Sequence, residues 1–378
     1  MGTDSLEAGL AALARIPSCK DLNRRDFLKI SGIALAGLAL PLGCASPEPE
    51  PSQMVEGIVR LSSPPVPAGN VSVGIARNQS IEAMVNRAID LAGGLDEIRN
   101  GDTVVIKPNL TTGYSLPSRV TTHPEVLRAV IRAVKARTPA SNITVAEASA
   151  FTDTSTLLVA EKTGAYEVIS SEGVSFLAWE DEEYVEAASF DFRRITFNLM
   201  IPLSLADGRF KHFINVPMLK NHEAIEYSNA EYTCCIKSHV GVISRETRIR
   251  GGGSGIHQAD LGEKVAELNL VVPEHAMNVV DALTVILTGG PASSEMLTAE
   301  PGLILACKDR VACDSLALAV LKHYAAQQGV KRDYVDKSVW QQAQIVRARQ
   351  LNLGRGPEDI RVSSDGVAEI DAILQQWS

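Results

Sequence analysis

Hydrophobic and polar positions alternate in blocks along the first half of the chain, and each block predicts one element. Residues 70–78 (NVSVGIARN) have the two-residue period of a strand, and residues 81–98 have apolar positions at helical spacing. A second strand is predicted at 101–109 (GDTVVIKPN), where a β-branched run ends at Pro108. The next blocks predict an amphipathic helix over 124–137, a strand over 142–149, a helix over 154–164 and a strand over 173–179.

This β–α–β–α order predicts an α/β fold with a mostly parallel sheet flanked by helices, because helical crossovers join parallel strands. Residues 191–216 predict a strand-rich insertion around Asp207–Gly208. We expect residues 70–378 to form a single large α/β domain. Its remaining elements are predicted as helices near 228–240, 257–271, 310–326 and 337–350, strands at 275–283 and 302–308, and a strand–turn–helix tail.

The N-terminus has the pattern of an export signal. Residues 23–29 (NRRDFLK) precede a weakly apolar run of about thirteen residues, which is too short to span a bilayer as a helix. Arg24 and Arg25 resemble the pair in a twin-arginine translocation signal, so residues 1–44 are interpreted as a signal peptide and the twin-arginine translocase as a partner. The alternative is an ordinary amphipathic helix start.

Cys44 follows in LPLGC, which resembles a lipoprotein cleavage box; the alternative is plain cleavage near Ala45. Residues 45–69 contain six prolines and no periodicity, and they predict a tether. A lipid on Cys44 would hold the protein at a membrane surface outside the cytoplasm. We therefore expect an exported protein, periplasmic or membrane-anchored.

Composition excludes several classes of function. The net charge of −9 argues against nucleic-acid binding, which uses a basic face. No two of the six cysteines form a C-x-x-C pair, so the chain has no iron–sulfur motif of its own. Twin-arginine export carries folded cargo, which favours a metal or nucleotide-like cofactor loaded in the cytoplasm without identifying it.

Polar residues cluster where the predicted strands end, which is where α/β folds bind ligands. Lys107 and Asn109 follow one strand and offer a cation and an amide to an anion; a structural ion pair of Lys107 is the alternative. His123 stands at a helix N-terminus, where it is either part of an anion site or only a cap. Glu147 is the last residue of another predicted strand and could act as a base or a metal ligand; a salt bridge is the alternative.

Residues 216–241 are the richest stretch. Lys220, Lys237 and His239 are candidates for anion binding, and His222 is a candidate for proton transfer with Asp281, which ends a later strand. The Gly-rich run 251–255 is interpreted as a lid or an anion contact. The vicinal Cys234–Cys235 is either a buried inert pair or a ligand for a soft metal.

Taken as an ordered set over roughly residues 70–325, these motifs resemble the domain-of-unknown-function family 362, which is sometimes fused to iron–sulfur segments. The family has no established reaction to transfer. The resemblance singles out the following residues: Lys107, Asn109, His123, Lys220, His222, Lys237, Gly241, Asp281 and Asp314.

Two hypotheses follow. The first is an exported enzyme, an oxidoreductase or isomerase, in which lysines hold an anionic substrate while His123 or His222, with Glu147 or Asp281, moves protons. The second is a non-catalytic lipoprotein that captures an anion at the membrane surface.

Overall fold

The computed structural model describes residues 54–55, 58–111, 120–149, 154–222, 230, 232–248, 255–257, 259–290 and 295–377. Arg24, Arg25 and Cys44 lie outside the described residues, as does most of the Gly-rich run 251–255. Within the described residues, none of the helices combines the length and apolar character that crossing a membrane requires.

An eleven-stranded sheet, mostly parallel, runs through the molecule, and this confirms the predicted fold class. Its central path has the order β15-β3-β14-β12-β9-β4-β5-β6. The strands β4, β5, β6, β9 and β12 are parallel, whereas β14 is antiparallel to both of its neighbours. Their bounds are β3 Val71–Ala76, β4 Val104–Pro108, β5 Ile143–Glu147, β6 Ser175–Ala178, β9 His212–Val216, β12 His275–Thr288, β14 Leu303–Cys307 and β15 Ile360–Asp365.

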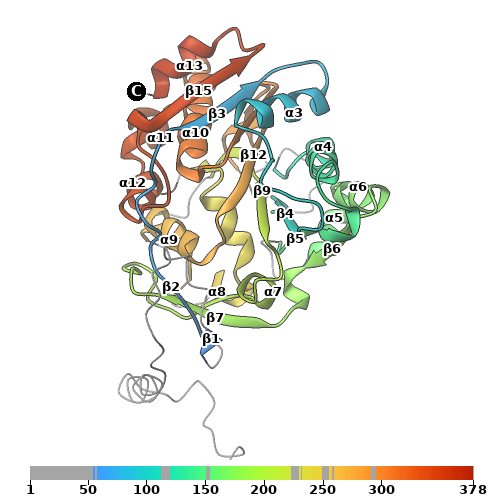
Figure 1. Cartoon of the computed structure of the whole chain (residues 1–378). Coiled ribbons are helices and arrows are strands. Elements are labelled where there is room, and N and C mark those ends of the chain that lie inside the picture. The colour runs from blue at the N-terminus through green and yellow to red at the C-terminus, as the bar shows by residue number, and fades with distance from the viewer. Residues whose placement is uncertain are drawn as a thin grey trace, which may run out of the picture. The chain divides into compact units, whose positions relative to one another are not determined.

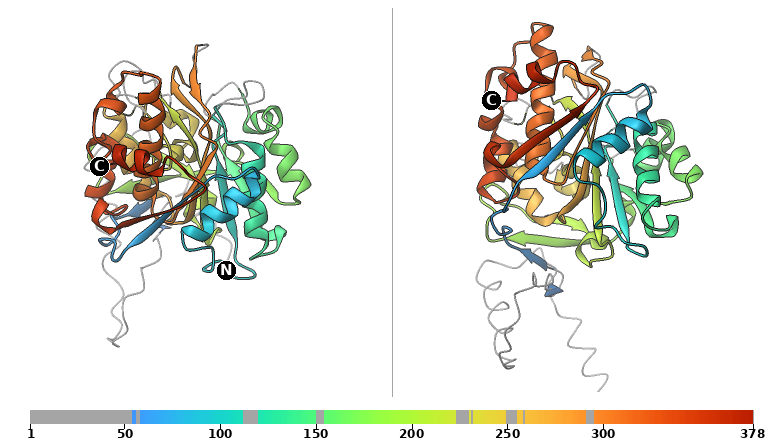
Figure 2. Two further views of the ribbon diagram at one scale, coloured as in Figure 1. Left: turned by 90° about the horizontal axis from the view of Figure 1, so that it is seen from above. Right: turned by 45° about the horizontal axis from the view of Figure 1, so that its top comes forward.

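Helices cover both faces of this sheet, and each face has its own apolar core (Figures 1 and 2). On one face lie α3 Ile81–Leu91, α4 Pro124–Lys135, α5 Thr156–Lys162 and α6 Ala165–Ser171. On the other lie α9 Leu261–Leu268, α10 Arg310–Gln327, α12 Ala343–Gln350 and α13 Ile370–Trp377. The amphipathic helix α4 shows how these helices pack on the sheet. His123 caps its N-terminus, Pro124 is its first residue, and its apolar face is buried.

The short strand β10 (Met218–Asn221) lies off the central path of the sheet. It pairs in parallel with the long β12 and antiparallel with β11 (Tyr232–Thr233), and a further strand, β13 (Leu297–Ala299), pairs with β12. Because β4, β5, β9, β10 and β12 are parallel, their carboxyl ends point to the same edge.

The predicted helix over 228–240 is wrong. The described residues of this range form β11 and the start of the 3-10 helix η3 (Lys237–Val242). The segment is buried on all sides. Its apolar residues therefore do not alternate with polar ones at a spacing that would distinguish a helix from a strand.

Part of the predicted tether, residues 45–69, is folded, because two of its segments belong to a second sheet of four strands. Its order is β1-β2-β7-β8, with bounds Met54–Val55, Ile58–Leu61, Tyr184–Ser189 and Leu199–Pro202. The strand β2 pairs with β7 along its whole length, so the folded unit begins before residue 70. The strand-rich insertion contributes β8 and the short α7 (Leu203–Ala206), followed by β9.

Smaller differences concern helix starts. The helix predicted from 257 begins at Leu261, and the one predicted from 337 is preceded by the short α11 (Asp333–Asp336) and η5 (Val339–Gln341). The remaining helical turns are α8 Arg245–Arg248, η1 Ala140–Asn142, η2 Trp179–Asp181, η4 Asn269–Val271 and η6 Pro357–Asp359.

Candidate functional site

The carboxyl ends of β4, β5 and β10 bring three predicted site residues to one edge of the large sheet. Lys107 lies near the end of β4, Glu147 is the last residue of β5, and Lys220 lies near the end of β10. All three side chains are buried. This is the edge at which α/β sheets bind ligands.

Lys107 and Glu147 form a buried ion pair. The Lys107 ammonium donates to Glu147 Oε2 at 2.8 Å, and Glu147 Oε1 accepts the backbone N–H of Ala148 at 2.8 Å. The ion pair that the sequence left open for both residues is therefore present. Burial lowers the pKa of Lys107, and the Glu147 charge opposes that shift.

Gly241 of η3 packs directly on this pair. A Cβ added there would lie 1.9 Å from Glu147 Oε1 and 2.8 Å from Lys107 Nζ. The Gly241 carbonyl accepts the Ala148 N–H at 3.1 Å, which fixes the backbone against the end of β5. The close approach requires a residue without a side chain.

Lys220 and Lys237 are buried lysines that make no ion pair with the described residues. Lys220 Nζ donates to Asn109 Oδ1 and Thr111 Oγ1, each at 3.1 Å, and to the carbonyl of Val120. The Lys237 ammonium has no hydrogen-bond partner in the described part of the chain. Burial lowers the pKa of each lysine to about 7, and for Lys220 the Lys237 charge adds to the effect.

Two imidazoles lie beside these lysines. The rings of His222 and His257 are stacked, with centroids 6.0 Å apart. Burial lowers the pKa of both rings, that of His257 to about 3, and the positive charge of Lys237 lowers both further. Both rings are therefore neutral at physiological pH, and His222 Nδ1 is buried with no hydrogen-bond partner among the described residues.

Arg248 adds a further buried cation. Its guanidinium donates to the carbonyls of Ile243, Ala148 and Ser149, while Nη2 has no partner in the described residues. The charge of Arg248 lowers the pKa values of Lys107 and His257, which places it at the same site. Thr233, which faces Lys220 across the β10–β11 ladder, also has a buried hydroxyl without a described partner.

The site therefore has more basic side chains than carboxylates. Of the buried side chains described here, Glu147 is the carboxylate at the cluster, and it is paired with Lys107. Lys220, Lys237 and Arg248 remain without a carboxylate partner among the described residues. Buried charges are normally paired, so this arrangement is suited to holding an anion.

His123 and Asp281 are joined to each other rather than to the lysines. Asp281 Oδ2 accepts the backbone N–H of His123 at 2.7 Å, and Oδ1 accepts that of Leu283 at 3.1 Å. The His123 ring accepts the N–H of Glu125 and caps α4. Burial raises the pKa of Asp281. Both residues hold the turn that enters α4.

His239 lies in a different buried cluster. Its ring is 4.7 Å from that of His275 between centroids, and its Nδ1 contacts the Ile236 carbonyl at 3.2 Å. His275 Nδ1 contacts Asn278 Oδ1 at 2.7 Å. His239 therefore does not join His222 beside Lys220.

Two residues of the site, His257 and Arg248, were not predicted as site residues from the sequence. Both flank the Gly-rich run, whose glycines suggested a loop. The spacing of Arg245 and Arg248 before that run was the available signal.

Comparison with known proteins supports the resemblance seen in the motifs. The sequence profile of the family described as Domain of unknown function (DUF362) matches residues 104–319, more than half of the chain. A search of curated proteins found no match to the chain. The matched range contains every residue of the lysine cluster from Lys107 to His257. The chain belongs to the DUF362 family.

Proposed function

We propose that this protein is an exported enzyme that binds a small anionic substrate, a carboxylate or a phosphate ester, between Lys220 and Lys237. The observation that carries the proposal is that both lysine side chains are buried and that neither makes an ion pair with a described residue. An uncompensated buried charge costs several kcal/mol. Without ligand, the lysines reduce this cost by losing protons; with an anion bound, they would keep them.

The same groups are suited to proton transfer. A lysine with a pKa of about 7 exchanges its proton readily near neutral pH. His222 offers a neutral ring nitrogen beside it. Isomerase or oxidoreductase chemistry on a hydroxy or keto acid would use such groups, and a phosphate-bearing cofactor would satisfy the same lysines.

Export is the second part of the proposal and rests on residues 1–44. Replacing Arg24 and Arg25 by lysine is expected to leave the chain in the cytoplasm with its N-terminus uncleaved. A palmitate analogue is expected to label the wild-type chain and to spare Cys44→Ser. Normal export of the arginine variant would contradict the signal, and labelling of Cys44→Ser would contradict the anchor.

Anion-dependent thermal shift tests the binding site. Phosphate and malonate are titrated into wild type, Lys237→Met and a control, Lys211→Met. In wild type, the exposed Lys211 ammonium pairs with Asp102 near the amino end of β4. At least one anion is expected to stabilise wild type and Lys211→Met. Lys237→Met is expected to bind the anion at least tenfold more weakly, so that its thermal shift at a given anion concentration is smaller. Its stability without anion should be unchanged or higher, because a buried unpaired charge has been removed.

The pH dependence separates this site from surface lysines. Because the anion needs protonated lysines whose pKa is about 7, affinity is expected to fall roughly tenfold per pH unit above pH 7 for each lysine required. Exposed lysines would bind equally well to about pH 9. Failure of both anions to stabilise wild type, or a flat profile, would contradict the proposal. Tight binding of a copurified anion without turnover would favour the capture lipoprotein.

A further inference from the structure

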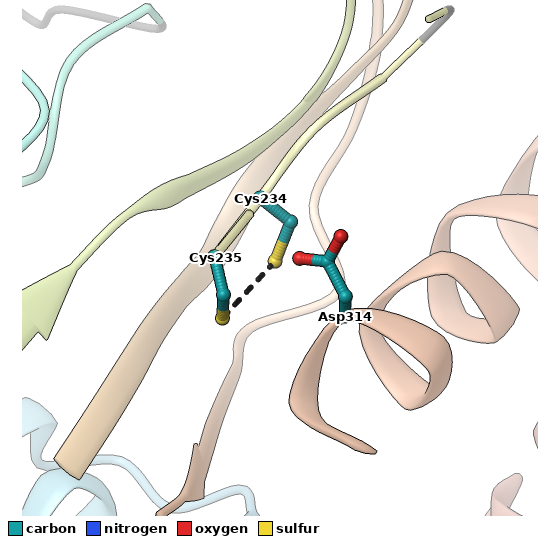
Figure 3. Close-up of side chains that lie close together, drawn as sticks. All are labelled: Cys234, Cys235 and Asp314. Carbon is teal, nitrogen blue, oxygen red and sulfur yellow. Dashed lines mark hydrogen bonds between the residues drawn. The ribbon is translucent and has the colours of Figure 1, made fainter. Parts of the chain in front are cut away.

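A second cluster of ligand atoms lies just before Lys237 in the chain. Cys234 and Cys235 are fully buried free thiols, and Asp314 on α10 faces them (Figure 3). The two sulfurs are 3.8 Å apart, and the sulfur and carboxylate ligand atoms of the three residues all lie within 4.8 Å of one another. This cluster takes no part in the anion site.

We infer that Cys234, Cys235 and Asp314 bind a thiophilic divalent cation, for which zinc is the best match. Two thiolates and a carboxylate are ligands that zinc accepts in tetrahedral sites. With zinc–sulfur bonds of about 2.3 Å, two sulfurs at tetrahedral positions are about 3.8 Å apart. The observed sulfur separation equals this edge. Each thiol must give its proton to solvent as the metal binds.

The surroundings of Asp314 are those of an oriented metal ligand. Its Oδ2 accepts the Tyr232 hydroxyl at 3.1 Å and Gln344 Nε2 at 2.8 Å, and its Oδ1 accepts the Ile236 N–H at 3.3 Å. Such hydrogen bonds fix a ligating carboxylate. Gln344 is 1% exposed, and its Oε1 has no hydrogen-bond partner among the described residues.

Two residues could supply a fourth ligand. The Gln344 carbonyl oxygen lies on the residue that holds Asp314. The Cys313 thiol, one residue before Asp314, interacts with the Cys235 thiol. Arg310, whose guanidinium interacts with the charge of Cys235, would offset the negative charge of the thiolates.

The site is closed, so the metal would be structural rather than catalytic. It would tie the start of η3, three residues from Cys234, to α10. Lys237 stands at that position. Burial raises the pKa of the Cys234 thiol to about 12, so metal affinity should increase with pH.

The test uses the whole chain and cobalt, which reports on its ligands by colour. The protein is unfolded under reducing conditions and refolded with one equivalent of Co²⁺, so that access to a buried site is not limiting. Wild type is expected to show a thiolate-to-cobalt charge-transfer band and intense visible bands of tetrahedral Co²⁺, both lost on adding zinc. X-ray absorption of the zinc form should show at least two sulfurs at about 2.3 Å.

Cys235→Ser and Asp314→Asn are expected to bind cobalt at least tenfold more weakly. Cys307→Ala, which removes another buried free thiol outside the three-residue group, should keep wild-type binding. The absorption spectrum of wild type does not depend on any variant folding. A wild type that takes up no cobalt, a zinc spectrum without sulfur, or full binding by Cys235→Ser would overturn the inference. The sulfur contact would then be only a thiol–thiol hydrogen bond.

Discussion

Replacing Gly241 by alanine is expected to lower the free energy of unfolding by about 3–5 kcal/mol, the cost of breaking a buried ion pair. The new Cβ would stand 1.9 Å from Glu147 Oε1 and 2.8 Å from Lys107 Nζ. Neither side chain has room to turn aside, because both are buried. The glycine cannot retreat either, since its carbonyl is held by the Ala148 N–H.

Denaturant unfolding monitored by circular dichroism measures this effect, and a fall in Tm on the order of 10 °C should accompany it. Gly356→Ala is the matched control. Its added Cβ would meet the ends of Arg349 and Glu358 at 2.6 Å, but both of those side chains are exposed and can swing away. A Gly241→Ala protein as stable as Gly356→Ala would show that η3 does not press on the ion pair.

Glu147→Gln is expected to destabilise the protein by a similar amount, about 3–5 kcal/mol at pH 7, because the Lys107 charge loses its partner. The loss should shrink as pH rises. Lys107 already has a lowered pKa, so above it the folded protein releases a proton that the unfolded chain keeps. The unfolded state then binds more protons, and stability increases with pH.

The double variant Lys107→Met/Glu147→Gln controls for the loss of shape. It should be more stable than the sum of the two single variants predicts by at least about 1 kcal/mol, since no charge is left unpaired. Its stability should also lack the rise with pH. Additive effects across the cycle, measured by denaturant unfolding, would mean that the two side chains are not coupled.

The sequence predicted the fold class because most elements have a clear period. The helix at α4 begins at the predicted cap and proline, and β4 and β5 are apolar runs bounded by turns. The described residues of the predicted helix from Tyr232 to Val240 were mispredicted because they are buried throughout. Burial on all sides removes the polar positions that define a period.

The part of the site that lies at strand ends could be predicted from the sequence. The parallel sheet brings Lys107, Glu147 and Lys220 to one edge, as expected from their positions after strands. The side on which His239 and His257 lie depends on loop paths, which have no sequence period. His239 therefore turned out to face His275, and His257 to stack on His222.

The central claim is that Lys220 and Lys237 hold an anion together, and a crystal of the protein grown with sodium selenate tests it most directly. Selenate has the shape and charge of a phosphate dianion, and selenium gives anomalous scattering. We expect one strong anomalous peak within hydrogen-bond distance of both ammonium groups, absent from crystals of Lys237→Met. An anomalous map without a peak there, while Lys220 and Lys237 each pair with a carboxylate of the chain, would contradict the account.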